Sequence, residues 1–130
     1  LLANSGRYYI GLSMTCYTSM FARPSVGGTL DEKSILLTNA GPVFTWGPSG
    51  LTVAVGHDKL QKGFFKKMWS VPYASTTLGA LTDAGYQELL LNVGGNNHID
   101  VLQSFLIMGD PLTKARATAP ANIFGPLMQQ

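Results

Sequence analysis

The sequence predicts an α/β layer fold whose sheet is incomplete, and three observations support this prediction. Short β-rich apolar segments alternate with segments of helical periodicity, which is typical of strands packed against helices. The 130 residues are enough for one domain with a sizeable core, and a charged content of 12% argues against disorder. Two or three recognisable strands are few for this length, so we expect the rest of the sheet to belong to a longer protein.

Two segments have the character of strands. Residues 7–14 are apolar on both alternating faces, which indicates a central strand covered by helices on both sides, and Cys16 follows at its carboxyl end. Residues 17–28 contain Ser, Arg, Pro and two Gly and are expected to form a loop. Residues 43–46 form the second predicted strand, which ends in a turn at residues 47–50.

Two helices are expected around the second strand. Thr29 and Glu32 have the spacing of a capping box, so a short helix should begin there and end near Asn39. The next helix should run to about Trp69. Its apolar face comprises Leu60, Phe64, Phe65, Met68 and Trp69. Lysines 59, 62, 66 and 67 lie largely away from this face, and we expect them to be solvated because the chain is nearly neutral.

Two more helices and a tail complete the predicted order. Thr76 or Thr77 can cap a helix that ends at Asn92. Its expected buried side comprises Leu78, Leu81, Gly85 and Leu89. Asn97 is expected to cap the last helix, which should continue to Gly109. Its expected inward side chains are Ile99, Leu102, Phe105 and Leu106. Residues 115–130 are rich in Ala and Pro and are predicted to be a linker or tail.

Composition and motifs exclude several functions. A net charge of +2 excludes a strongly basic nucleic-acid binder, and no apolar run approaches the roughly 18 residues of a membrane span. One Cys cannot form an internal disulfide framework or a Cys-rich zinc site, and no metal-binding motif is present. The turn at residues 47–50 lacks the Lys of a phosphate-binding loop. We therefore expect no metal and no organic cofactor.

Cys16 is the strongest candidate for a reactive residue. Ligands of open α/β sheets gather beyond the carboxyl ends of the strands, where this Cys is expected. The alternative is a buried thiol that serves only as a small apolar side chain. A thiol nucleophile normally needs a His, and the chain has His57 and His98. Neither follows a predicted strand, so both are interpreted as surface or helix-capping residues.

Several segments together resemble the gingipain-like cysteine peptidases. They are Thr15-Cys16-Tyr17-Thr18-Ser19-Met20-Phe21, Gly41 to Gly50 (GPVFTWGPSG), Gly63-Phe64-Phe65, Thr77-Leu78-Gly79-Ala80 and Phe105 to Leu112 (FLIMGDPL). Their order and spacing over residues 4–114 carry the resemblance. The sequence departs from the family pattern at Ser19, where Gly is common, and at Trp46, which lies too early to match the aromatic residue beside the specificity pocket.

The resemblance implies a caspase-like three-layer sandwich with a mostly parallel sheet flanked by helices. Residues 1–114 would be the C-terminal portion of this catalytic domain. In caspase-type arrangements the catalytic His precedes the Cys by about 50 residues, whereas 15 residues precede Cys16 here. The chain also begins without Met. We therefore expect the missing N-terminal half of the domain, including the His, to lie upstream in a longer protein.

The resemblance implies a cysteine endopeptidase whose nucleophile is Cys16 and whose substrate is a peptide or protein. Ser49, Gly50, Leu51 and Thr52 are the expected substrate-binding residues. The family's secreted or cell-surface location would apply, and the resemblance leaves room for a structural calcium ion. The alternative is a non-catalytic caspase-like interaction domain of a larger surface or secreted protein, with Cys16 packed in the core. A small α/β hydrolase-like or carrier domain is the third reading.

Overall fold

The computed structural model describes residues 2–23, 25, 27–70, 75–92 and 94–115. The elements, in chain order, are β1 (Tyr9–Leu12), α1 (Leu30–Ile35), β2 (Pro42–Pro48), α2 (His57–Ser70), α3 (Leu78–Asn92), α4 (Asn97–Ser104) and β3 (Phe105–Gly109). Alternation of strands and helices confirms the predicted α/β class.

Strand β2 is the centre of the sheet. Within the described residues the order is β1-β2-β3, with β1 parallel and β3 antiparallel to β2. The predicted arrangement, a mostly parallel sheet flanked by helices, is confirmed, with β3 as the antiparallel member. It is consistent with an incomplete caspase-like sandwich.

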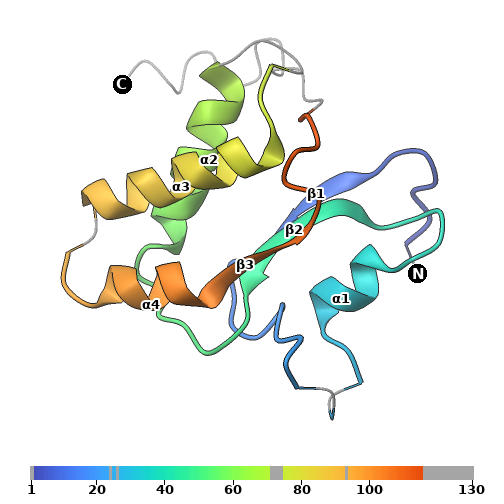
Figure 1. Cartoon of the computed structure of the whole chain (residues 1–130), viewed down its shortest axis with the longest axis horizontal. Coiled ribbons are helices and arrows are strands. Elements are labelled where there is room, and N and C mark those ends of the chain that lie inside the picture. Colours follow the sequence, from blue (N-terminus) through green and yellow to red (C-terminus); the bar gives the residue numbers. More distant parts are fainter. Residues whose placement is uncertain (1, 24, 26, 71–74, 93, 116–130) are drawn as a thin grey trace.

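Helices cover both faces of the sheet (Figure 1). Alternate residues of β2 point to opposite faces, and Trp46 points towards α2 and α3, where its ring stacks on Phe64 with 6.1 Å between centroids. Gly47 faces the opposite layer, where a Cβ atom would meet the carboxylate of Asp31 in α1. The main core therefore lies between β2 and the α2–α3 pair, and α1 covers the other face.

The α2–α3 pair packs closely because glycines stand at the crossing. A Cβ atom at Gly85 would lie 2.6 Å from the Trp46 ring and 2.7 Å from the Leu60 carbonyl oxygen. The Lys62 ammonium reaches Glu88 across the two helices at 2.7 Å. This close approach allows the buried ring of Trp46 to reach both helices.

Several local predictions are confirmed. The capping box of Thr29 and Glu32 begins α1. Of the two candidate caps for α3, Thr77 performs the role, because its hydroxyl oxygen accepts from the Ala80 amide at 3.2 Å. All four residues predicted for the inner side of α3 are buried: Leu78, Leu81, Gly85 and Leu89. In α2, Phe65 and Trp69 were expected to be buried but are 39% and 38% exposed, and they stack on each other.

The prediction that the last helix continues to Gly109 is wrong in its second half. Residues 105–109 form β3, which pairs with residues 44–48 of β2. The Ser104 carbonyl accepts bonds from the amide and hydroxyl of Ser49, and this tie to the chain after β2 leads residues 105–109 into the sheet. The helical part begins one residue after Asn96, so Asn96 rather than Asn97 occupies the cap position. Ile99, expected to point inward, is 41% exposed.

Smaller differences concern the first strand and the first helix. β1 covers only Tyr9–Leu12 of the predicted 7–14, and Tyr9 is 40% exposed, so this strand is less buried than expected. α1 ends at Ile35 rather than near Asn39, which adopts a positive φ of 57°. Most of the predicted tail lies outside the described residues, and Ala115 is buried, with its amide bonded to the Thr76 carbonyl. In the part of the chain that is described, no helix has the length and apolar character needed to span a membrane.

Candidate active site

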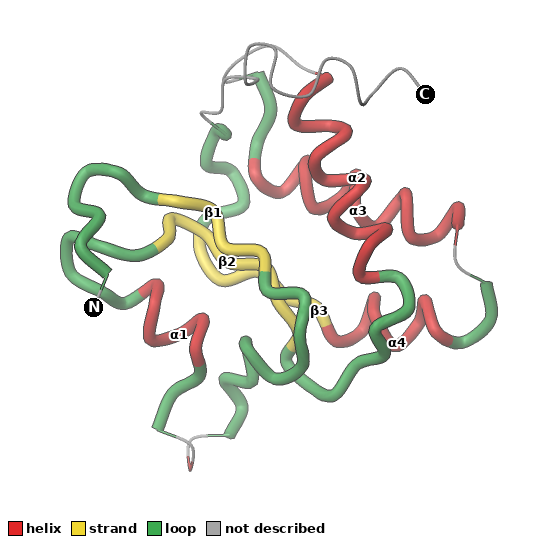
Figure 2. Tube along the Cα trace, turned by 180° about the vertical axis from the view of Figure 1, so that it is seen from behind, coloured by secondary structure: helices red, strands yellow, loops and turns green. Residues whose placement is uncertain are grey.

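The chain that follows β1 runs beside the carboxyl end of β2. The Ser13 amide donates to the Trp46 carbonyl at 2.9 Å, and the Ser19 amide donates to the Pro48 carbonyl at 3.0 Å. Between these two points the Tyr17 amide donates to the Gly50 carbonyl at 3.2 Å. Because β1 and β2 are parallel, the loops that follow them emerge at the same end of the sheet (Figure 2). We call residues 13–19 the Cys16 segment.

Cys16 lies at the centre of this segment and is half-buried. Its thiol donates to the Thr52 carbonyl oxygen at 3.4 Å. The structure thus brings the predicted nucleophile against residues 49–52, the segment predicted to bind substrate. The Cys follows β1 by four residues rather than lying at its last position.

Several backbone N–H groups at this end of the sheet have no acceptor among the described residues. Within the described residues the amide of Cys16 has no acceptor, and the amides of Gly50, Leu51 and Thr52 have none either. Free amides beside a thiol are the groups that can stabilise an oxyanion or bind the carbonyls of an extended peptide. Ser49 differs from its neighbours, because its amide and hydroxyl both donate to Ser104.

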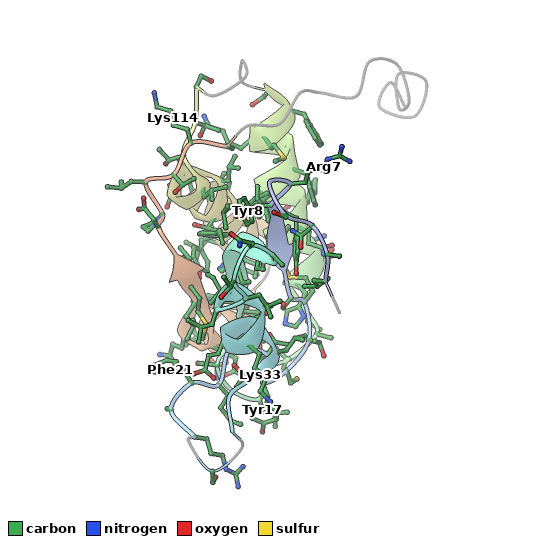
Figure 3. The ribbon with its side chains drawn as sticks, turned by 90° about the vertical axis from the view of Figure 1, so that its right-hand side faces the viewer. Arg7, Tyr8, Tyr17, Phe21, Lys33 and Lys114 are labelled. Atoms are coloured by element: carbon green, nitrogen blue, oxygen red, sulfur yellow. The ribbon has the colours of Figure 1, made fainter. Side chains whose placement is uncertain are left out.

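Tyr17, directly after Cys16, has an unusual backbone conformation. Its φ is 64°, in the left-handed region that is unfavourable for residues other than Gly, Asn and Asp. Such strain gathers at functional sites, where the surroundings impose it. The Tyr17 side chain is 45% exposed, and it lies with Phe21 at the end of the molecule away from Lys114 (Figure 3).

Asp31 is a component of this region that sequence reasoning missed. Its side chain is buried, and its two oxygens accept bonds from the hydroxyls of Ser13 and Ser19. Asp31 lies in the first turn of α1, where a carboxylate is favourable in any case, and nothing in the local pattern signals its contact with the Cys16 segment. The bond to Ser19 gives a reason for Ser at a position where the resembled family commonly has Gly.

The two histidines occupy helix starts, as expected. His57 is the first residue of α2, but it is buried rather than at the surface. Its Nδ1 atom lies 3.3 Å from the Met14 carbonyl oxygen, and its ring packs edge-on against Phe105. Its Nε2 atom is buried without a hydrogen-bond partner among the described residues. His98 is the second residue of α4, and its Nδ1 atom is similarly buried and unpaired in the described structure.

The described residues contain no group of three or more His, Cys, Asp or Glu side chains that could hold a metal ion. The groups that the described structure places at this site are the Cys16 thiol, nearby hydroxyls and backbone amides.

Comparison with known proteins places the chain in a family. No curated protein and no solved structure matches it significantly. Residues 1–116 match the family model described as Peptidase family C25. This match spans every element from β1 to β3, together with the Cys16 segment and residues 49–52. The chain therefore belongs to peptidase family C25, the gingipain family of cysteine peptidases.

Proposed function

We propose that this chain is the C-terminal portion of a cysteine endopeptidase domain, in which Cys16 is the nucleophile that attacks the peptide carbonyl. The observation that carries the proposal is the half-buried Cys16 thiol, 3.4 Å from the Thr52 carbonyl oxygen, in a region where the amides of Cys16 and of residues 50–52 have no acceptor within the described residues. Membership of family C25 supports the reaction class.

The reaction follows the general scheme of thiol acyl transfer. The Cys16 thiolate adds to the carbonyl carbon and forms a tetrahedral intermediate, and a His protonates the leaving amine. Water then hydrolyses the thioester and regenerates the thiol. The free Cys16 amide is a donor for the developing oxyanion, because it has no other acceptor within the described structure.

The base of this reaction would come from the upstream part of the domain. His57 is directed at the Met14 carbonyl and packs on Phe105, which gives it a structural role. The observation that would most directly support an upstream base is a strand followed by His-Gly within about 50 residues before Cys16.

The second candidate function is a non-catalytic interaction domain of the same fold. The observation that favours it is the hydrogen bond from the Cys16 thiol to the Thr52 carbonyl, because this bond gives the thiol a role in the local structure. The two candidates differ in the consequence of removing the thiol, since only the peptidase loses an activity.

Substitution of Cys16 in the longest native chain that carries these residues tests the proposal. We expect Cys16→Ser to keep the fold and to reduce hydrolysis of a fluorogenic peptide library by at least about a thousandfold, since a hydroxyl is a far weaker nucleophile near neutral pH. Lys114→Ala is the matched control, because Lys114 is exposed and lies at the other end of the molecule (Figure 3).

The outcome also separates the two candidates. Full activity of Cys16→Ser would exclude Cys16 as the nucleophile. Unfolding of Cys16→Ser, in a protein whose parent has no activity to lose, would identify Cys16 as a core residue and support the interaction domain.

A further inference from the structure

Asp31 is a buried carboxylate that the proposed reaction does not use. Asp31 is 3% exposed, and it takes part in none of the ion pairs among the described residues. Burial of a carboxylate is unfavourable unless hydrogen bonds satisfy it. Ser13 Oγ donates to Oδ1 at 2.9 Å, and Ser19 Oγ donates to Oδ2 at 2.5 Å.

The two serines bracket the nucleophile. Ser13 and Ser19 stand three residues before and three residues after Cys16. One carboxylate on α1 therefore holds both ends of the Cys16 segment. The backbone of Asp31 adds a third connection, because its amide donates to the Thr18 carbonyl at 3.0 Å.

Gly47 confines the carboxylate on the side of the sheet. A Cβ atom at this position would lie 2.6 Å from Asp31 Oδ2, 2.6 Å from Thr18 Oγ1 and 2.9 Å from Ser13 Cβ. The Asp31 carboxylate and the side chains of Thr18 and Ser13 thus fill the space that a side chain at position 47 would need. A group packed this closely has little freedom to adopt another rotamer.

We infer that Asp31 is a positioning residue: by holding Ser13 and Ser19 it fixes the backbone of the Cys16 segment and so the place of the thiol beside Thr52. This inference rests on the proposed role of Cys16 as nucleophile. The left-handed backbone of Tyr17 fits it, because an unfavourable conformation persists only where its surroundings impose it. The bonds of Asp31 to both ends of the segment, together with the bond from Tyr17 to Gly50, impose it here.

The test compares Asp31→Ala and Asp31→Asn with Glu32→Gln in the longest native chain that carries these residues. Glu32 is a matched control, because it is the next residue of α1 and, within the part of the chain that is described, its carboxylate accepts hydrogen bonds from Thr29 and from no residue of the Cys16 segment. Two measurements are made by mass spectrometry on each variant. They are hydrogen exchange of the Tyr17 and Ser19 amides, relative to the amides of β2, and the rate at which iodoacetamide alkylates Cys16.

We expect Asp31→Ala to increase exchange of the Tyr17 and Ser19 amides at least about tenfold relative to β2, since two hydrogen bonds to a charged group are lost. Alkylation of Cys16 should accelerate about threefold or more, because the thiol no longer rests against the Thr52 carbonyl. Asp31→Asn keeps one acceptor oxygen and should recover part of both effects. Peptide hydrolysis should show a kcat at least about tenfold lower with KM within about twofold, as expected for a misplaced nucleophile.

Failure of the inference and failure of the proposed function give different results. If Asp31→Ala changes exchange and alkylation no more than Glu32→Gln does, Asp31 is not a positioning residue, whatever the activity. If Asp31→Ala loosens the segment while Cys16→Ser keeps full activity, the nucleophile assignment is wrong and the positioning role for catalysis falls with it. If Asp31→Ala does not fold, Ser13→Ala and Ser19→Ala each remove one of the two bonds and should each show part of the increase in exchange; no increase in either variant would overturn the inference.

Discussion

Replacement of Gly47 by Ala should disturb the candidate active site more than it disturbs the fold. The added Cβ atom would lie 2.6 Å from both Asp31 Oδ2 and Thr18 Oγ1. Ordinary van der Waals contact begins at 3.4 Å, so each oxygen must move by about 0.8 Å. The carboxylate cannot retreat without lengthening its bond to Ser19. Overpacking of this kind typically costs about 1–3 kcal/mol in the free energy of unfolding, and we expect the upper part of this range.

The assay pairs chemical denaturation with alkylation of Cys16 by iodoacetamide, both in the native chain. Gly85→Ala is the control, because a Cβ atom there would lie 2.6 Å from the Trp46 ring, in the α2–α3 layer on the other face of the sheet. Overpacking at Gly85 is partly offset by about 1 kcal/mol of helix propensity, so a loss of about 1–2 kcal/mol is expected.

The two variants should differ in the alkylation rate. Gly47→Ala displaces atoms that hold the Cys16 segment, so its rate should change about threefold or more, whereas Gly85→Ala should leave the rate within about twofold of the parent. Equal alkylation rates in the two variants, at similar losses of stability, would refute the reasoning that connects Gly47 and Asp31 to the thiol. A Gly47→Ala variant as stable as the parent would refute the packing argument itself.

Four further predictions concern the isolated chain, the α2–α3 contact and the histidines. The isolated 130-residue chain should hydrolyse no fluorogenic peptide, because its catalytic partner is expected upstream; turnover that disappears with Cys16→Ala would contradict this. The isolated chain should also self-associate in sedimentation experiments, since β1 forms an edge of the described sheet; a monomer with a sharp cooperative melt would count against it. The hydrogen bond from Lys62 lowers the pKa of Glu88, so its contribution to stability is present above the unfolded pKa and is lost as the pH falls through the lower folded pKa. Urea midpoints of the parent between pH 6 and about 3 should therefore fall more than those of Glu88→Gln, and less so in high salt; identical pH profiles would exclude the effect. His57→Ala and His98→Ala should each retain at least about a tenth of the peptidase activity, a loss under about 1.4 kcal/mol; a thousandfold loss with the fold intact would place the base in this chain.

The local part of the fold could be predicted from the sequence. Capping at Thr29 and Thr77 depends on side chains and amides within a few residues of each other, so the pattern of the sequence contains the whole interaction. The loop after β1 follows from Gly, Pro and Ser, which favour turn conformations, whereas the turn predicted at residues 47–50 begins only after Pro48, because β2 includes residues 47 and 48. The position of Cys16 beyond a strand, and hence near the chain that follows the parallel strand β2, could be expected for the same reason.

Features that depend on distant contacts could not be predicted. Phe105 to Met108 is an apolar run whose pattern fits a buried strand or the inner side of a helix equally well. It is a strand because residues 44–48 offer a partner edge and because Ser49 binds the Ser104 carbonyl, more than 50 positions along the chain. Asp31 is similar, since its hydroxyl partners are determined by where α1 packs on the sheet.

The hydrogen bonds around residues 49–52 also restrict how a peptide could be bound there. Ser49 is held on one side by its bonds to Ser104, and the carbonyls of Gly50 and Thr52 are held on the other side by the Tyr17 amide and the Cys16 thiol. These bonds occupy two acceptors of the segment, whereas the donors at Gly50, Leu51 and Thr52 have no partner within the described residues. A peptide lying on this segment would therefore be held chiefly through its own carbonyl groups, which accept from these amides. This polarity suits the proposed reaction, because a carbonyl held by backbone donors beside the Cys16 thiol is the group that the thiolate would attack.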